Sequence, residues 1–183
     1  KIAASPILQQ LDLAPGAYGV LTLHRPSNVD NRDSLKRIYD AIAQVSRDIP
    51  IIFPIHPRTR KQLDAFNLLS GTADARLRLI EPLGYLDFMR LVGSAKLVLT
   101  DSGGLQEETT VLGVPCLTLR ATTERPITVE LGTNVVVGDD PARIIVEASR
   151  ILAGEGKRGT IPKYWDGRSS HRIVSAIEHY FFE

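Results

Sequence analysis

The sequence predicts an α/β domain built on a Rossmann-like, doubly wound parallel sheet. Short runs that are apolar throughout recur along the chain, and stretches with helical periodicity lie between them. Strands that are apolar at every position are typical of a parallel sheet whose two faces are both covered. The intervening helices are the crossovers that such a sheet requires. We therefore expect a single domain over residues 1–183.

The first half of the chain alternates three strand-like runs with two helix-like stretches. Between the first two runs, apolar residues recur every three or four positions, which predicts a helix with one buried face. Asp33 or Ser34 is the expected cap of this helix, and Pro50 is expected to end it. The predicted strands are 19–23, 51–53 and 77–80, and the predicted helices are 33–49 and 58–69.

The second half of the chain continues the same alternation. Pro141 is expected to open the last helix of the sheet region, because proline is favoured at the first helical position. The predicted strands are 97–99, 116–119 and 135–137, and the predicted helices are 85–92, 105–112 and 141–152.

Both ends of the sequence carry helix-like patterns that need partners. Residues 1–11 are expected to be the end of a helix that begins earlier, and residues 154–168, rich in glycine and charge, are expected to be a loop. Residues 170–182 have apolar side chains at helical spacing, which predicts a C-terminal helix in need of a packing surface. We therefore expect this chain to be one half of a larger protein.

Composition excludes several classes of partner and site. The formal net charge of +1 argues against nucleic acid and against a membrane surface, and no leader peptide or membrane-spanning run is found. A lone cysteine, Cys116, excludes an internal disulfide and fits a soluble protein of the reducing cytoplasm. The four histidines are too scattered to predict a metal site, so no metal is expected.

Polar residues directly after the first two strands are candidates for a ligand site, because ligands bind at the carboxyl ends of parallel strands. His24-Arg25 can contact a phosphate, since arginine offers a planar fork of donors and histidine a hydrogen bond or a proton. The alternative is a strand-end histidine bonded to backbone. His56-Pro57-Arg58 repeats the theme, but helix capping is the favoured interpretation there.

The turn Thr100-Asp101-Ser102-Gly103-Gly104, after the fourth strand, is the most informative segment. Adjacent glycines let the backbone approach a ligand closely, and the following helix start offers free N–H groups to a phosphate. Glu108 lies about one helical turn beyond Gly104, where a carboxylate can bind both hydroxyls of a ribose. The alternative is a structural turn in which the acidic residues only favour the helix start. The loop 120–126 after the fifth strand is a further candidate for binding a charged ligand.

Familiar nucleotide and hydrolase motifs are absent from the sequence. There is no G-x-G-x-x-G dinucleotide fingerprint, no P-loop and no G-x-S-x-G elbow. The phosphate site predicted here is therefore of a different kind.

Taken together, these segments resemble the non-hydrolysing UDP-N-acetylglucosamine 2-epimerases from about Tyr18 to the C-terminus. The matching segments are 23–25 with 28–30, 55–60, 97–108 and 119–126. The resemblance implies the C-terminal, nucleotide-binding half of a GT-B fold, with an N-terminal domain missing and a homodimer expected for the full-length protein. It implies UDP and UDP-GlcNAc as ligands and no cofactor.

The resemblance also implies a role for each matching residue. Ser102, Gly103 and Gly104 would hold the diphosphate, Glu108 the ribose, and Phe88 with the Leu83 backbone the uracil, whereas Arg125 would help bind the sugar-phosphate end. His24 would contact the β-phosphate and is the candidate catalytic residue of this chain, with Arg25 as its substrate-binding neighbour. The family's reaction inverts C2 of the sugar by elimination and re-addition of UDP. Its acid and base carboxylates come from the other domain, so the isolated domain is expected to be inactive.

Two positions depart from the family pattern. Ser27, preceded by Pro26, stands where the family usually has a glutamate, and Trp165 stands where a small residue is usual. Two other functions are weighed against the epimerase. One is a GT-B glycosyltransferase, which would transfer the sugar to an acceptor, and the other is a non-catalytic UDP-sugar binding module. The segment 122–126 favours the epimerase over the glycosyltransferase.

Overall fold

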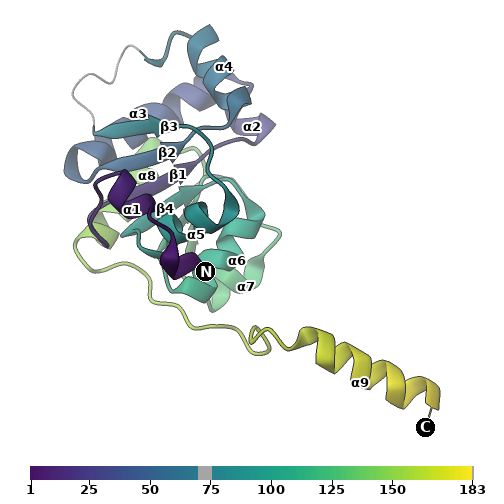
Figure 1. Cartoon of the computed structure of the whole chain (residues 1–183). Coiled ribbons are helices and arrows are strands. Elements are labelled where there is room, and N and C mark those ends of the chain that lie inside the picture. The colour runs from purple at the N-terminus through teal and green to yellow at the C-terminus, as the bar shows by residue number, and fades with distance from the viewer. Residues whose placement is uncertain (70–75, 183) are drawn as a thin grey trace.

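The protein folds around one parallel sheet that is covered by helices on both faces (Figure 1). The computed structural model describes residues 1–69 and 76–182. Its six strands lie in the order β3-β2-β1-β4-β5-β6. They are β1 (Gly19–Thr22), β2 (Ile51–Pro54), β3 (Leu77–Ile80), β4 (Leu97–Thr100), β5 (Cys116–Thr118) and β6 (Asn134–Val136). This order confirms the doubly wound, Rossmann-like fold.

The direction of winding reverses between β1 and β4. The chain runs outward from β1 through β2 to β3, then returns to place β4 on the other side of β1. The two central strands pair in register, with Gly19 opposite Leu97 and Thr22 opposite Thr100. In open α/β sheets the carboxyl ends of the strands at such a switch point form the ligand-binding crevice.

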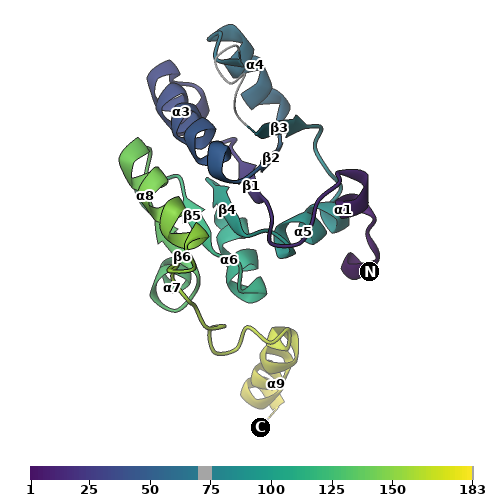
Figure 2. The ribbon, with the colours of Figure 1, turned by 90° about the vertical axis from the view of Figure 1, so that its left-hand side faces the viewer.

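Alternate residues of each strand supply two separate cores. The first lies under α3 (Arg32–Asp48) and α8 (Pro141–Leu152), and the second under α1 (Ile7–Gln10), α5 (Tyr85–Gly93) and α6 (Gly103–Leu112). In β1, for example, Leu21 faces the first core and Val20 the second. Figure 2 shows these two groups of helices on opposite sides of the sheet. Burial on both faces explains why the central strands β1, β2 and β4 are almost wholly apolar, whereas the edge strand β3 exposes Arg78.

Several predicted helix boundaries were wrong. Asn31 caps α3, because its side chain accepts from the backbone N–H groups of Asp33 and Ser34, which were the predicted caps. The helix α4 (Pro57–Ala65) ends four residues before the predicted end at residue 69. Asn67 has a φ of 53°, which is a left-handed conformation that a helix cannot contain. The helix α6 begins at Gly103 rather than at residue 105, directly after the extended Ser102.

The N-terminal segment was also wrongly predicted. Residues 1–11 form two short turns, η1 (Ile2–Ala4) and α1, instead of the end of one long helix. Ser5 between them is extended, with φ −65° and ψ 131°, as expected for a residue that precedes proline. Two short helices were not predicted from the sequence, and each begins with a proline. They are α2 (Pro26–Val29) and α7 (Pro126–Glu130).

The C-terminal helix α9 (Ser169–Phe182) stands away from the sheet at the end of an extended segment (Figures 1 and 2). Its predicted apolar face is present, and each side chain of that face is at least half exposed. These residues are Ile173, Val174, Ile177, Tyr180 and Phe181. Within the ranges that the structure describes, no helix is both long enough and apolar enough to cross a membrane.

Candidate functional site

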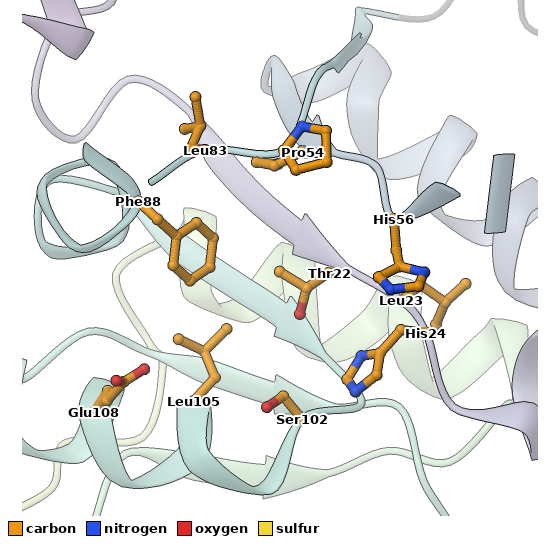
Figure 3. Close-up of a pocket in the computed structure, with 11 residues that line it drawn as sticks. Thr22, Leu23, His24, Pro54, His56, Leu83, Phe88, Ser102, Leu105 and Glu108 are labelled. Atoms are coloured by element: carbon orange, nitrogen blue, oxygen red, sulfur yellow. The ribbon is translucent and has the colours of Figure 1, made fainter. Parts of the chain in front are cut away.

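A cavity of about 340 Å³ opens at the carboxyl edge of the sheet, over the switch point between β1 and β4 (Figure 3). Each of the strands β1, β2 and β4, or the segment that follows it, contributes to the lining. The lining residues are Thr22, Leu23, His24, Pro54, His56, Pro82, Leu83, Phe88, Ser102, Leu105 and Glu108. Five of the nine residues predicted for the site thus line one cavity: His24, Leu83, Phe88, Ser102 and Glu108.

The two central strands are joined at this edge through Asp101, which is fully buried. Its carboxylate accepts from the backbone N–H of His24 at 3.0 Å and of Arg25 at 2.8 Å. It also lies 2.8 Å from His24 Nδ1 and accepts from the Asn28 amide at 3.3 Å. Asp101 belongs to the predicted turn, but its role could not be predicted, because only its side-chain contacts show that it joins the two strands.

The turn after β4 leaves its helix start free for a ligand. Ser102 is extended, and its hydroxyl makes no capping hydrogen bond to α6. The N–H groups of the first turn of α6 therefore have no side-chain partner from the cap, and they carry a partial positive charge next to Ser102 in the cavity lining. This arrangement can bind an anion.

The two glycines of the turn have different surroundings. A Cβ on Gly103 would lie 2.5 Å from Glu124 Oε1, so the Glu124 side chain would have to move to admit one. A Cβ on Gly104 would meet no atom within 4 Å. Among the described residues, nothing would contact a Cβ at Gly104, so the space beside it is open.

Gln106 ties the glycine turn to the loop 120–126 and is fully buried. Its amide nitrogen donates to the Ser102 carbonyl at 3.2 Å, and its oxygen accepts from Thr123 Oγ1 at 2.5 Å and from Asn134 Nδ2 at 3.0 Å. Thr123 in turn accepts from the backbone N–H of Arg125 at 2.9 Å. The predicted loop and the predicted turn thus form one hydrogen-bonded unit.

The two predicted arginines lie beside the cavity rather than in its lining. Arg25 Nη2 is 3.5 Å from Glu124 Oε1, and Glu124 also pairs with Arg120 at 2.5 Å. A hydrogen bond from its own backbone and the neighbouring Arg120 hold the pKa of Glu124 below its usual value. Arg125 Nε lies 3.1 Å from Glu107 Oε1, as an ion pair without hydrogen-bond alignment. Each guanidinium has further N–H donors that these carboxylates do not use, and Arg25 Nε makes no hydrogen bond among the described residues.

The opposite end of the cavity combines an aromatic ring with a carboxylate. Phe88 and Leu83 lie above Glu108 in Figure 3. Tyr85 donates its hydroxyl to Glu108 Oε1 at 3.3 Å. Burial raises the pKa of Glu108, and the neighbouring Glu107 charge adds to the rise, whereas the hydrogen bond from Tyr85 opposes it. A flat apolar wall next to a carboxylate is suited to a base and its ribose.

His56 both caps a helix and lines the cavity, the two roles that the sequence left open. Its Nδ1 accepts from the backbone N–H of Arg58 at 3.2 Å, which caps α4 as favoured in the sequence analysis. Its ring also lines the cavity, 6.3 Å from the His24 ring between centroids.

Among the further cavities of the described residues, two have linings that bear on ligand binding. One, of about 490 Å³, lies at the amino edge of the sheet, among residues that precede the strands such as Gly16 and Lys96, and three cationic side chains are among its lining. The other, of about 390 Å³, is mostly apolar and brings Trp165 close to Tyr85 behind Glu108. Neither is lined by the start of α6, where the backbone N–H groups lack a capping side chain.

Comparison with known proteins gives a consistent match. The sequence pattern that describes the family "UDP-N-acetylglucosamine 2-epimerase" matches residues 1–178. The UDP-N-acetylglucosamine 2-epimerase of Methanocaldococcus jannaschii is 46% identical over 165 residues, which are 88% of this chain and 44% of that protein. The corresponding protein of Methanococcus maripaludis is 42% identical over 163 residues, or 87% of this chain and 44% of that protein. This chain therefore spans about half the length of the curated relatives it matches.

Solved structures agree with the sequence match. The M. jannaschii UDP-GlcNAc 2-epimerase in complex with UDP-GlcNAc and UDP superposes with a TM-score of 0.84 at 42% identity, covering 97% of this chain and 50% of that one. The Neisseria meningitidis enzyme bound to UDP-GlcNAc gives a TM-score of 0.79 at 30% identity, covering 94% and 48%.

Proposed function

The chain belongs to the UDP-N-acetylglucosamine 2-epimerase family, and on that basis we propose that it is the UDP-binding domain of an epimerase that interconverts UDP-GlcNAc and UDP-ManNAc. One observation carries the proposal. A single cavity at the switch point joins an anion-binding helix start at one end to Phe88 and Glu108 at the other. That order matches the order of diphosphate, ribose and base in a uridine nucleotide.

Each part of the nucleotide has a counterpart in the site. The diphosphate lies at Ser102, Gly103 and Gly104, with His24 beside the β-phosphate. The ribose hydroxyls bind Glu108, and the uracil lies against Phe88 and the Leu83 backbone. Arg25 and Arg125 lie beside the phosphate end, and they bind the sugar-phosphate through N–H donors that their carboxylate partners do not use.

In the proposed reaction, UDP leaves C1 of the sugar and returns after the configuration at C2 has changed. Negative charge develops on the departing phosphate, and the helix start of α6 and the His24 ring face the place where it develops. Preorganised donors aimed at developing charge are usually the largest single contribution to such catalysis. The removal and return of the C2 proton need an acid and a base, which we assign to another domain.

We propose that this other domain precedes the chain, so that the complete protein has a GT-B architecture and acts as a homodimer in the cytoplasm. The half-length match to the relatives and the exposed apolar face of α9 support a second domain. The substitution of Ser27 for the usual glutamate leaves the proposed nucleotide contacts untouched, since Ser27 lies in α2 and outside the cavity lining.

The test has two parts. First, the chain is titrated with UDP and UDP-GlcNAc by calorimetry, and saturable binding without turnover is expected. Second, a longer protein that joins this chain to its N-terminal domain is incubated with UDP-GlcNAc, and proton NMR is expected to show UDP-ManNAc. Sugar transfer to an added acceptor would instead identify a glycosyltransferase, and binding without any reaction of the longer protein would identify a non-catalytic module.

A further inference from the structure

The carboxylate of Asp101 is fully buried and surrounded by donors on every oxygen. Two backbone N–H groups, the amide of Asn28 and the ring of His24 all reach it. A carboxylate without its proton can only accept hydrogen bonds. A buried carboxylate with this many donors is held in one orientation, because any rotation would leave a donor unpaired.

The contact between Asp101 and His24 determines where the His24 ring carries its proton. His24 Nδ1 lies 2.8 Å from Asp101 Oδ1, and the backbone N–H of the same residue binds the same carboxylate. Since the carboxylate is an acceptor, Nδ1 must be the donor, and in the neutral ring Nε2 then has a free lone pair. Figure 3 shows the ring at the cavity end between Ser102 and His56.

His56 has the opposite arrangement and provides an internal comparison. Its Nδ1 accepts from the backbone N–H of Arg58. The proton of its neutral ring must therefore be on Nε2. Two histidines that line one cavity are thus held in opposite tautomers.

We propose that Asp101 is a positioning residue that fixes His24 as the Nδ1–H tautomer, so that Nε2 takes up a proton when a diphosphate binds and donates it in a hydrogen bond. The protonated ring then lies between two anions, the Asp101 carboxylate and the phosphate. The proton comes from solvent, stays on the nitrogen, and returns to solvent when the ligand leaves. The second half of this proposal, proton uptake, rests on the proposed function.

Other charged groups around His24 set the conditions for this uptake. Asp101, from the turn after β4, favours the charged ring. His56, after β2, disfavours it whenever its own ring is charged, and the two ring centroids are 6.3 Å apart. Arg25 follows His24 in the chain, but its guanidinium is paired with Glu124. The carboxylate of Asp101 is the group in direct contact, so its effect is the strongest.

The first experiment needs no ligand. Two-bond nitrogen–proton NMR spectra of the chain report the tautomer of each histidine, and they are recorded at rising pH until the ring signals stop changing. The variants His24→Gln and His56→Gln assign the signals. We expect Nδ1–H for His24 and Nε2–H for His56. A His24 signal of the Nε2–H type, or an average of both forms, would overturn the positioning role of Asp101.

The second experiment measures proton uptake by calorimetric titration with UDP-GlcNAc in two buffers of different ionisation enthalpy. The diphosphate diester of this ligand has no titrating proton near neutrality, so uptake reports the protein. At about pH 7.5 we expect uptake of up to about one proton per ligand. The uptake should be lost in His24→Gln and kept in His171→Gln, a matched change on α9 far from the cavity.

The variant Asp101→Asn then links the two observations. An amide offers one acceptor oxygen in place of two, and its NH₂ faces N–H donors, so His24 is expected to lose its fixed tautomer and its proton uptake. If Asp101→Asn does not fold, the NMR spectra of the unaltered chain still decide the positioning role. Normal ligand binding without proton uptake, or uptake that persists in His24→Gln, would contradict the second half. Failure of UDP-GlcNAc to bind would count against the proposed function, while the tautomer result stands on its own.

Discussion

Replacing Glu108 by glutamine should weaken UDP binding about 30-fold, which corresponds to about 2 kcal/mol. Glu108 lies in the cavity lining beside Phe88, and we propose that its carboxylate accepts from both ribose hydroxyls. A hydrogen bond to a charged group contributes about 1 kcal/mol more than a neutral one, and two such bonds are changed. The amide keeps the size of the side chain, so the expected loss comes from charge rather than from shape.

Calorimetric titration measures this effect at about pH 7.5, well above the ordinary range of a glutamate, because burial raises the pKa of Glu108. Inorganic pyrophosphate is the companion ligand, since it can occupy the helix start but has no ribose. Glu147→Gln on α8 is the control, with the same change of net charge outside the cavity. An equal loss for UDP and pyrophosphate, or no loss for UDP, would refute the assignment of Glu108 to the ribose.

Three further changes test other parts of the structure. Gly104→Ala should raise the free energy of unfolding by up to about 1 kcal/mol, because alanine favours the helix, and should still weaken UDP binding about tenfold or more. Urea unfolding measures the first effect and calorimetry the second. Unchanged UDP affinity would mean that the ligand does not approach this residue. Gly159→Ala should lower the free energy of unfolding by about 2 kcal/mol or more, since its Cβ would overlap the backbone of Gly132 and lie 2.6 Å from Thr133 N. Urea unfolding measures this loss, and an unchanged free energy of unfolding would contradict the close packing of Gly159 on Gly132. Burial raises the pKa of Cys116 to about 12, so a thiol reagent at neutral pH should label it only after urea unfolds the chain; rapid labelling of the folded chain would contradict its burial.

The strands and the parallel, doubly wound sheet could be predicted from the sequence for a physical reason. The central strands are buried on two faces, so each appears as an apolar run such as 97–99, and the helices between such runs leave little choice but a parallel sheet. Helix ends were less accessible, because a cap depends on one local hydrogen bond. Asn31, Asp33 and Ser34 are all good capping residues, and only the backbone conformation selects Asn31.

The candidate site was predicted in outline because parallel strands bring their carboxyl ends to one edge. That geometry alone places His24 next to Ser102, although they are far apart in the chain. The roles of Asp101 and Gln106 could not be predicted, since both are buried residues that act through side-chain contacts with other segments. The positions of the arginines depended in the same way on which carboxylates they pair with.

The most direct test of the central claim is an amide NMR titration of the chain with UDP. We expect saturable shifts at residues 102–105, the proposed phosphate site, and at residues 83–88, the proposed uracil site. The larger cavity at the amino edge, with Lys96 and Arg158 in its lining, is the built-in comparison and should stay unchanged. Shifts confined to that amino edge, or none at saturating UDP, would contradict the claim that the glycine turn after β4 binds the nucleotide.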